Sequence, residues 1–199
     1  CCEASRQEII RRYYAAMCSA RQGMSDSRPA EKIKLLINQL GITVKDRPVI
    51  DAAVARAEQT GEPAAAIQLP DGEIVTGKTT KLLGASAAVL LNALKRLGGI
   101  QKDMHLISPI VIEPIQDLKV NHLGNHNPRL HSDEILIALS ICAATNPTAA
   151  LAMQQLSKLR GCEAHASVIL SRVDENVYHK LGVNLTCEPK YQTKKLYHA

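Results

Sequence analysis

The stretch that decides the fold is AAAIQLPDGEIVTGKT, residues 64–79. Two short segments of extended character, Ala64–Leu69 and Glu73–Thr76, flank the tripeptide Pro70-Asp71-Gly72. These three residue types favour a tight turn, because proline fixes one backbone angle and glycine accepts a positive one. The stretch therefore predicts a β-hairpin, and the rest of the chain is interpreted outward from it.

The same stretch contains GEIVTGKT, residues 72–79, which fits the phosphate-loop pattern G-x-x-x-x-G-K-[ST]. A true phosphate loop wraps backbone N–H groups around phosphates and leads directly into a helix. Here the four variable positions are Glu-Ile-Val-Thr, which alternate as in a strand, and Gly72 belongs to the predicted turn. We therefore interpret the phosphate-loop match as chance.

A narrower prediction remains for the corner between the hairpin and the next helix. A lysine and the N–H groups of a helix start attract anions there, and three hydroxyls lie close by in the sequence. The candidate ligand-binding residues of this corner are Lys78, Thr79, Thr80 and Ser86. For the hydroxyls themselves, ordinary helix capping is the favoured role and ligand binding is the alternative.

Residues 1–60 are predicted to form a small helical subdomain. Apolar residues recur there at i, i+3, i+4 and i+7, the spacing of one helix face. The helices are rich in alanine and have little core of their own, so we expect them to pack on the following domain or on a partner. The three sets are Ile10/Tyr13/Tyr14/Met17, Ile33/Leu36/Ile37/Leu40 and Ile50/Ala53/Val54/Ala57.

Residues 61–199 are predicted to form a mixed α/β domain of about five strands flanked by helices. After the hairpin we expect a long helix ended by Gly98-Gly99, a strand at Met104–Ile107, and a helix from Pro109 that Pro114 kinks. Further helices are predicted at Ser132–Thr145, apolar nearly all round and therefore expected to be buried, and at Pro147–Leu159. A strand–helix–strand unit with parallel strands is predicted at Ala164–Leu170, Asp174–Leu181 and Val183–Cys187.

A second concentration of polar residues is NHLGNHNPRLHSDE, residues 121–134. It holds His122, His126 and His131, whose spacing could supply metal ligands. However, no H-E-x-x-H is present, and Asn, His and Asp are common in loops simply because they favour turns. We expect no metal site. A loop that binds an anion or a polar ligand is favoured over a metal site, and an ordinary turn-rich loop is the alternative. The candidate binding residues are Asn125, Asn127, Arg129 and His131.

Composition narrows the class of protein. The chain has 199 residues, 46% hydrophobic and 22% charged, with a formal charge of +5, five Tyr and neither Phe nor Trp. This composition predicts a globular protein, and nucleic-acid binding is not expected because no aromatic residues interleave with Lys or Arg. Six Cys without a C-x-x-C predict reduced thiols in the cytoplasm, and no apolar run approaches the length of about 20 residues that spans a membrane. No cofactor is identified.

Several long strings together resemble the C-terminal part of the bacterial domain-of-unknown-function 1846 family, also called uncharacterised protein family 0371. The resemblance covers nearly the whole chain. Its strings include QLPDGEIVTGKT, LLGASAAVLLNALKRL, NPRLHSDEILIALSICAATNPTAAL, LRGCEAHASVILS and LGVNLTCEPKYQTKKLYH.

The resemblance implies that this sequence is a fragment of a chain more than twice as long, without its N-terminal domain. It also implies that residues 61–199 are similar in topology to the cytidine deaminases. Those enzymes bind zinc with an H-x-E at a helix start and a later P-C-x-x-C. Here the corresponding helix opens with Gly84-Ala85-Ser86-Ala87 and no P-C-x-x-C exists, so zinc deamination is excluded.

Two functional hypotheses follow. The first is a cytoplasmic enzyme domain that binds a phosphorylated or nucleotide-like small molecule without zinc, with a site completed by the missing N-terminal domain. The second is a structural module in which the helices of residues 1–60 mediate self-association into a homo-oligomer.

Overall fold

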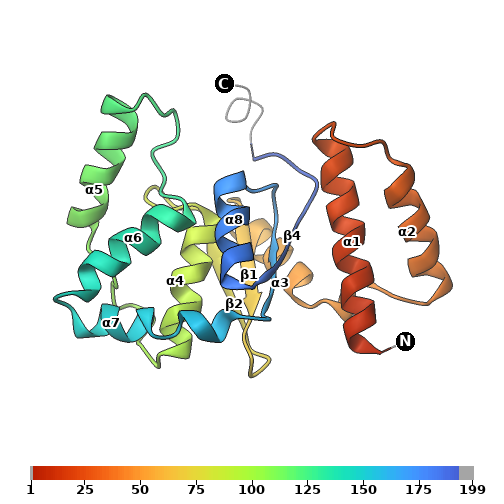
Figure 1. Cartoon of the computed structure of the whole chain (residues 1–199), viewed down its shortest axis with the longest axis horizontal. Coiled ribbons are helices and arrows are strands. Elements are labelled where there is room, and N and C mark those ends of the chain that lie inside the picture. Colours follow the sequence, from red (N-terminus) through yellow and green to blue (C-terminus); the bar gives the residue numbers. More distant parts are fainter. Residues whose placement is uncertain (1, 193–199) are drawn as a thin grey trace.

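A four-stranded mixed sheet forms the centre of the protein (Figure 1). The structure is a computed structural model that describes residues 2–192. The strands are β1 (Ala64–Gln68), β2 (Ile74–Lys78), β3 (Glu163–Ala166) and β4 (Asn184–Cys187), in the order β2-β1-β3-β4. β1 is antiparallel to both of its neighbours, and β4 is parallel to β3. The predicted hairpin and the predicted parallel pair are both confirmed.

The turn of the hairpin forms as its residue types require. Ile67 lies opposite Val75 in the register of β1 and β2. At the turn, the Gly72 amide donates to the Leu69 carbonyl at 2.9 Å, and Gly72 has a φ of 86°, which favours glycine.

Close packing explains why residue 77 is a glycine. Gly77 lies inside β2, directly against helix α4 (Ala85–Leu97), and an added Cβ would stand 2.3 Å from the Val89 amide nitrogen. The second glycine and the lysine of the apparent phosphate-loop pattern are therefore strand residues, and the helix begins seven residues after Lys78. This geometry agrees with the interpretation of the match as chance.

The three helices predicted in residues 1–60 are confirmed as α1 (Glu3–Arg21), α2 (Arg28–Gln39) and α3 (Val49–Thr60), with a short 3-10 turn, η1 (Val44–Asp46), before α3. α3 covers one face of the sheet, where Val49 and Ala53 pack on Ala66 of β1. α1 lies along β4, and α2 packs on α1 without burying any residue of its own.

The other face of the sheet carries the main core. Ala65 and Ile67 of β1 pack there with residues of α4, and helix α8 (Arg172–Leu181) connects β3 to β4. Side chains alternate between the two faces along β1, as strand geometry dictates. The remaining elements are α5 (Pro109–Asp117), the π turn η2 (Leu118–His122), α6 (Ser132–Ala143), α7 (Pro147–Met153) and the 3-10 turn η3 (Leu156–Leu159).

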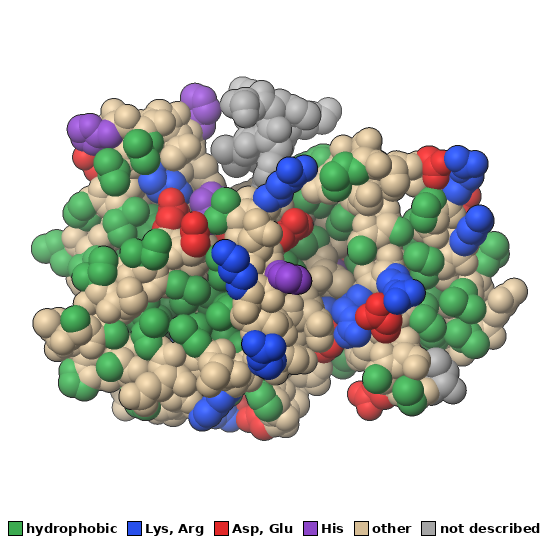
Figure 2. Space-filling view, viewed as in Figure 1, with side chains coloured by type: hydrophobic (Ala, Val, Ile, Leu, Met, Phe, Trp, Pro, Cys, Tyr) green, Lys and Arg blue, Asp and Glu red, His purple; other side chains and the backbone are tan. Residues whose placement is uncertain are grey.

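Two predictions about these elements are wrong. Met104–Ile107 is a loop, although Leu106 and Ile107 are buried, so the sheet has four strands within the described residues rather than five. α6 is not buried all round, because Ile137 and Ile141 are 60% and 64% exposed. Figure 2 shows hydrophobic side chains gathered on this α5–α6–α7 side of the molecule.

Two further observations concern the chain as a whole. All five described cysteines, Cys2, Cys18, Cys142, Cys162 and Cys187, are free thiols. Within residues 2–192, no helix combines the length and the apolar character needed to cross a membrane.

Candidate functional site

The two polar segments singled out in the sequence lie side by side in the structure. Leu83 and Leu130 form an isolated parallel bridge, in which the Gly84 amide donates to the Leu130 carbonyl at 3.2 Å. Arg129 Nε donates to the Thr80 carbonyl at 2.8 Å. The corner after β2 and the loop before α6 are therefore one continuous surface.

The candidate residues are divided among three hollows on that surface. Lys78 and Thr80 line a large cavity of about 680 Å³. A small hollow of about 40 Å³ is lined by Thr79, Ser86, Asn127, Arg129 and His131. Asn125 lies with Asn127 and His131 at an open pocket of about 550 Å³. His131 thus borders two of the three hollows.

The large cavity, here named the basic cavity, lies between β2, α4 and the segment from Lys102 to Ile112. Among the described residues that line it, none is Asp or Glu. Its floor is apolar, with Leu82, Leu83, Leu91, Leu106, Ile107 and Ile112. Its basic lining residues are Arg56, Lys78, Lys81, Lys95, Lys102 and His105, of which only Lys78 was a candidate from the sequence.

Few of these cations are neutralised by the protein. Within the described residues, Lys78, Lys81 and Lys102 make no side-chain hydrogen bond or ion pair. Lys95 Nζ donates to the Lys102 carbonyl at 2.9 Å, and burial lowers the pKa of Lys95. A cavity with this lining favours an anionic ligand.

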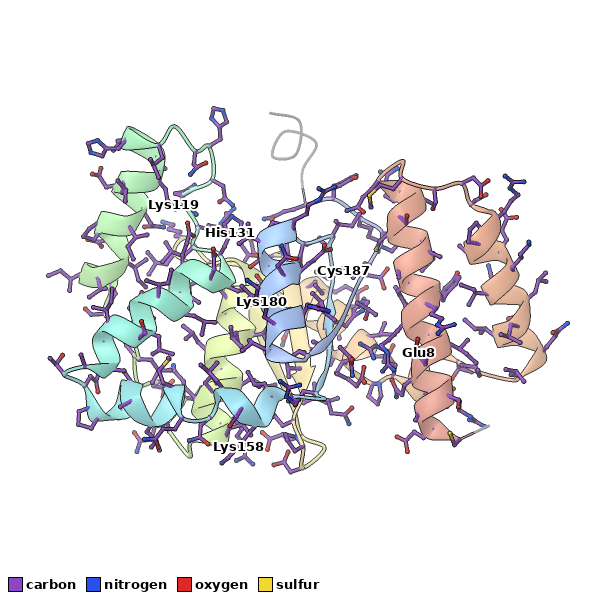
Figure 3. All side chains as sticks on the ribbon, viewed as in Figure 1. Glu8, Lys119, His131, Lys158, Lys180 and Cys187 are labelled. Carbon is purple, nitrogen blue, oxygen red and sulfur yellow. The ribbon has the colours of Figure 1, made fainter. Side chains whose placement is uncertain are left out.

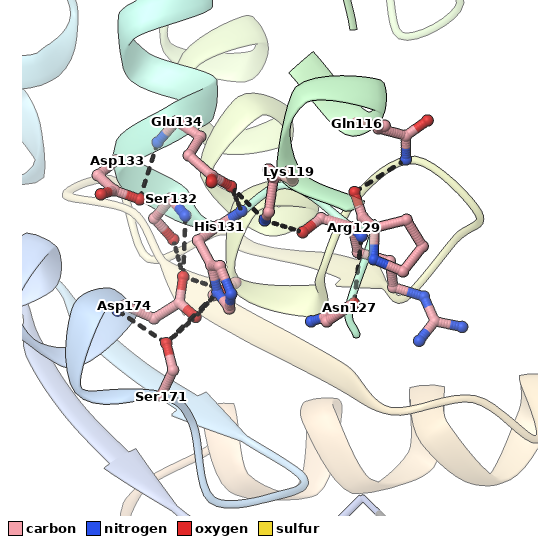
Figure 4. Close-up of polar contacts among 12 residues, drawn as sticks. Gln116, Lys119, Asn127, Arg129, His131, Ser132, Asp133, Glu134, Ser171 and Asp174 are labelled. Atoms are coloured by element: carbon pink, nitrogen blue, oxygen red, sulfur yellow. Dashed lines mark hydrogen bonds and ion pairs between the residues drawn. The ribbon is translucent and has the colours of Figure 1, made fainter. Parts of the chain in front are cut away.

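The small hollow borders a buried carboxylate that the sequence interpretation missed. Asp174 is 4% exposed and lies in the first turn of α8. Its carboxylate accepts hydrogen bonds from three serine hydroxyls, those of Ser86, Ser132 and Ser171, at 2.8, 2.7 and 2.7 Å. Figure 4 shows the bonds from Ser132 and Ser171. The three donors come from the starts of α4, α6 and α8, so Asp174 joins three helix N-termini.

Asp174 also holds His131. Nδ1 of His131 lies 2.9 Å from Oδ2 of Asp174 (Figure 4). Burial by itself would raise the pKa of Asp174, but the hydrogen bonds from His131 and Ser132 hold it well below its ordinary value. The hydrogen bond to Asp174 in turn raises the pKa of His131, although burial of the imidazole acts in the opposite direction. An ionised carboxylate only accepts hydrogen bonds, so Nδ1 carries the proton.

The loop that carries Arg129 and His131 is anchored by Lys119, which is 4% exposed. Lys119 Nζ donates to the Arg129 carbonyl at 2.8 Å and to Glu134 Oε2 at 2.7 Å. The same Glu134 oxygen accepts from the His131 amide at 2.8 Å. In Figure 3, Lys119 lies between α5 and α6, and His131 lies at the end of α6 that is nearest to α8. The backbone of the loop is thus fixed by charged hydrogen bonds.

The three histidines of this segment do not converge. His122 is 67% exposed in its side chain and lies 3.8 Å from Asp117, His126 is exposed, and His131 turns toward Asp174. Among residues 2–192, no group of three or more His, Cys, Asp or Glu side chains is arranged to hold a metal ion.

Replacing Asp174 by Asn is expected to make the protein less stable by about 2 kcal/mol at pH 7, because a charged acceptor of buried donors is lost. The folded-state pKa of Asp174 lies below its unfolded value, so the stabilisation is complete above about pH 5 and is lost as the pH falls through the folded pKa. Urea unfolding at pH 7 and pH 3 measures both effects. The stability of Asp174→Asn should change less with pH than that of the wild type, whereas the exposed control Asp103→Asn should follow the wild type.

The fold and the site define a class: a mixed α/β domain with a central four-stranded sheet and a basic cavity beside its edge strand β2. Its membership follows from sequence comparison. The profile described as "Domain of unknown function DUF1846, C-terminal" matches residues 45–197, and the chain belongs to this family.

Curated relatives carry the name UPF0371 protein. One from Streptococcus pyogenes serotype M5 is 56% identical over 195 residues, which are 98% of this chain and 40% of the relative. One from Streptococcus thermophilus is 55% identical over the same share of each chain. The chain therefore spans 40% of the length of these relatives, as the resemblance implied. The family is uncharacterised, so the relatives assign no activity to the cavity or to the hollows.

Proposed function

We propose that this domain binds a phosphorylated or nucleotide-like small molecule in the basic cavity, without zinc. The observation that carries the proposal is the lining of the cavity. Within residues 2–192 it has five Lys or Arg side chains and His105 and no carboxylate. Lysine ammonium groups provide point charges for phosphate oxygens. The volume of about 680 Å³ lies within the usual range for small-molecule sites, about 300–1,000 Å³.

The apolar floor suggests which part of the ligand lies deepest. Leu91 and Ile112 face the cavity from α4 and α5, while Lys78 and Lys81 lie on its β2 side. A ligand with a phosphate at one end and a base or another flat, weakly polar group at the other matches this division. A simple inorganic anion would leave the apolar floor unused.

The proposal also covers the location of the protein, the part of the longer relatives that completes the site, and the topology of the domain. We expect the enzyme to act in the cytoplasm, with the remaining part of the longer relatives completing the site over residues 61–199. A cytidine-deaminase-like topology is supported by the hairpin, the following helix α4 and the parallel β3–β4 unit. The start of α4, Gly84-Ala85-Ser86-Ala87, offers no zinc ligand, so the chemistry differs from that of the deaminases.

A structural role is the second candidate, and the surface of α2 favours it. Leu35, Leu36 and Leu40 are 63%, 42% and 42% exposed on a helix that buries no residue. In this alternative the helices of residues 1–60 form a unit that associates with a second copy. Sedimentation at micromolar concentration tests it: a dimer that Leu35→Gln dissociates would support self-association through α2, and a monomer would contradict it.

Replacing Lys78 by Gln is expected to weaken the binding of ADP or pyrophosphate about tenfold, because one charge-assisted contact contributes about 1.5 kcal/mol or more. Isothermal titration calorimetry measures the affinity. The control Lys34→Gln removes an exposed lysine on α2 and should leave the affinity within about twofold of the wild type. Equal affinities of Lys78→Gln and the wild type, or no binding of either probe, would contradict the proposal.

A further inference from the structure

The small hollow has room for at least one water molecule. Its volume of about 40 Å³ exceeds the roughly 10–15 Å³ that one water requires. Its polar lining includes Thr79, Asn127, Arg129 and His131. A hollow with several polar groups and room for one small molecule is hydrated rather than dry.

Thr79 brings an unused hydroxyl to this hollow. The residue is 4% exposed, and its amide donates to the Pro63 carbonyl at 2.7 Å. Its hydroxyl makes no hydrogen bond with any described residue. This hydroxyl is therefore available to a water molecule in the hollow that Thr79 lines.

His131 brings a free acceptor to the same hollow. Nδ1 donates its hydrogen bond to Asp174. In the neutral imidazole, Nε2 is therefore the unprotonated nitrogen and can accept a proton. Nε2 has no hydrogen-bond partner among residues 2–192. The nearby serine hydroxyls of Ser132 and Ser171 both donate to Asp174, so they do not compete for it.

The charged groups around His131 come from each neighbouring element. Asp174 of α8 and Glu134 of α6 favour its protonated form, whereas Lys119 of the π turn opposes it. Arg129 lines the same small hollow from the loop. The carboxylate is the partner in direct contact, so the imidazolium is stabilised where it forms.

We propose that His131, oriented by Asp174, is a general base that activates a water molecule in the small hollow for hydrolysis of a phosphate ester or anhydride. The substrate class rests on the proposed function. The water gives a proton to Nε2 while its oxygen bonds to phosphorus. The bond from phosphorus to the leaving oxygen breaks, and that oxygen keeps the electron pair and takes a proton from solvent. The imidazolium then releases its proton to solvent, which restores the neutral base. Thr79 positions the water, and Arg129 offers its positive charge to the phosphoryl oxygens.

The competing explanation is that Asp174 and His131 only tie the starts of α4, α6 and α8 together. Both explanations require the same hydrogen bonds and the same tautomer. They differ in turnover, because a purely structural histidine has no influence on the rate of hydrolysis at saturating substrate in a folded protein.

The experiment measures hydrolysis of p-nitrophenyl phosphate and ADP by the chain between pH 5 and pH 9. We expect the rate to rise with pH as His131 loses its proton, with a midpoint above the ordinary histidine value of about 6.5. His131→Gln should lower kcat at least about 100-fold with a smaller effect on KM, and Thr79→Val should lower kcat about tenfold. The exposed neighbour His126→Gln is the matched control and should leave kcat and KM unchanged.

The variant Asp174→Asn tests whether Asp174 orients His131 for catalysis or only stabilises the fold. We expect it to lower kcat and to move the midpoint of the pH profile to lower pH, since the imidazolium loses its carboxylate partner. Nitrogen-15 NMR of the histidine side chains checks that the variants are folded and that His131 carries its proton on Nδ1 in the wild type. A His131 that carries its neutral-form proton on Nε2 would overturn the proposal.

The remaining outcomes distinguish this proposal from the binding proposal. A wild type that binds ADP but hydrolyses neither probe overturns the general base and leaves ligand binding in the basic cavity intact. Hydrolysis that His131→Gln does not change also overturns it. Hydrolysis lost in His131→Gln and unaffected by Lys78→Gln supports the general base and contradicts the basic cavity as the substrate site.

Discussion

Gly77→Ala is expected to destabilise the protein by about 3 kcal/mol or more, one of the largest effects of any single methyl group in this chain. An added Cβ would lie 2.3 Å from the amide nitrogen of Val89, 2.6 Å from its Cα and 2.8 Å from the carbonyl carbon of Ala88. These are backbone atoms of α4, so no side-chain rotation relieves the contact. Either β2 or α4 must move, and both belong to the main core. Urea unfolding measures the loss.

Gly84→Ala is the matched control. Gly84 precedes α4, has a φ of −68°, and its nearest atoms to an added Cβ are the Leu130 carbonyl oxygen at 3.7 Å and Ser86 Oγ at 3.8 Å. Its replacement should cost about 1 kcal/mol or less, since alanine is only a poorer helix cap than glycine. Similar stability of Gly77→Ala and the wild type would show that β2 and α4 separate easily. It would also reopen the phosphate-loop interpretation, in which this glycine serves a ligand.

Glu163→Gln is expected to destabilise the protein by about 3–5 kcal/mol, because it leaves the charge of Arg47 buried without a counter-ion. Arg47 is 0% exposed and its guanidinium pairs with Glu163. It also donates to the carbonyls of Ala164 and Asn184, at 2.7 and 2.8 Å, and so joins the segment before α3 to β3 and β4. Thermal and urea unfolding measure the change.

Two further variants test this explanation. The double variant Arg47→Met with Glu163→Gln should regain part of the lost stability, because an apolar side chain replaces the unpaired charge. Glu8→Gln removes a partly exposed partner of Arg11 and Arg12 and should cost less than about 1 kcal/mol. If the single and the double variant are equally unstable, the loss comes from packing and not from the unpaired charge.

Most helices and strands could be predicted from the sequence, and the errors share one cause. The hairpin and the helices of residues 1–60 follow from turn residues and apolar spacing, which are local properties. The strand at Met104–Ile107 and the complete burial of α6 were wrong predictions. An apolar sequence indicates that a segment is buried, but it does not determine its secondary structure or which of its faces is covered. Leu106 and Ile107 are buried from a loop, while Ile137 and Ile141 face outward from a helix.

The candidate site was predicted in part. The corner after β2 and the loop before α6 were recognised because polar residues gather there in an otherwise aliphatic chain. Asp174 was missed because Ser171-x-x-Asp174 is an ordinary helix start, and its serine partners come from other elements. Arg56 and Lys95 were missed because each lies on its own helix, and only the fold brings them to one cavity.

By itself the sequence determined the family, the hairpin, and the strand character of GEIVTGKT, because these depend on residue types and on neighbours along the chain. The tertiary structure alone decided why Gly77 is glycine, which cations share a cavity, and that one buried carboxylate orients His131. Those properties depend on close approach between segments far apart in the chain. Steric contact and charge act over a few ångströms in space, whatever the separation in sequence.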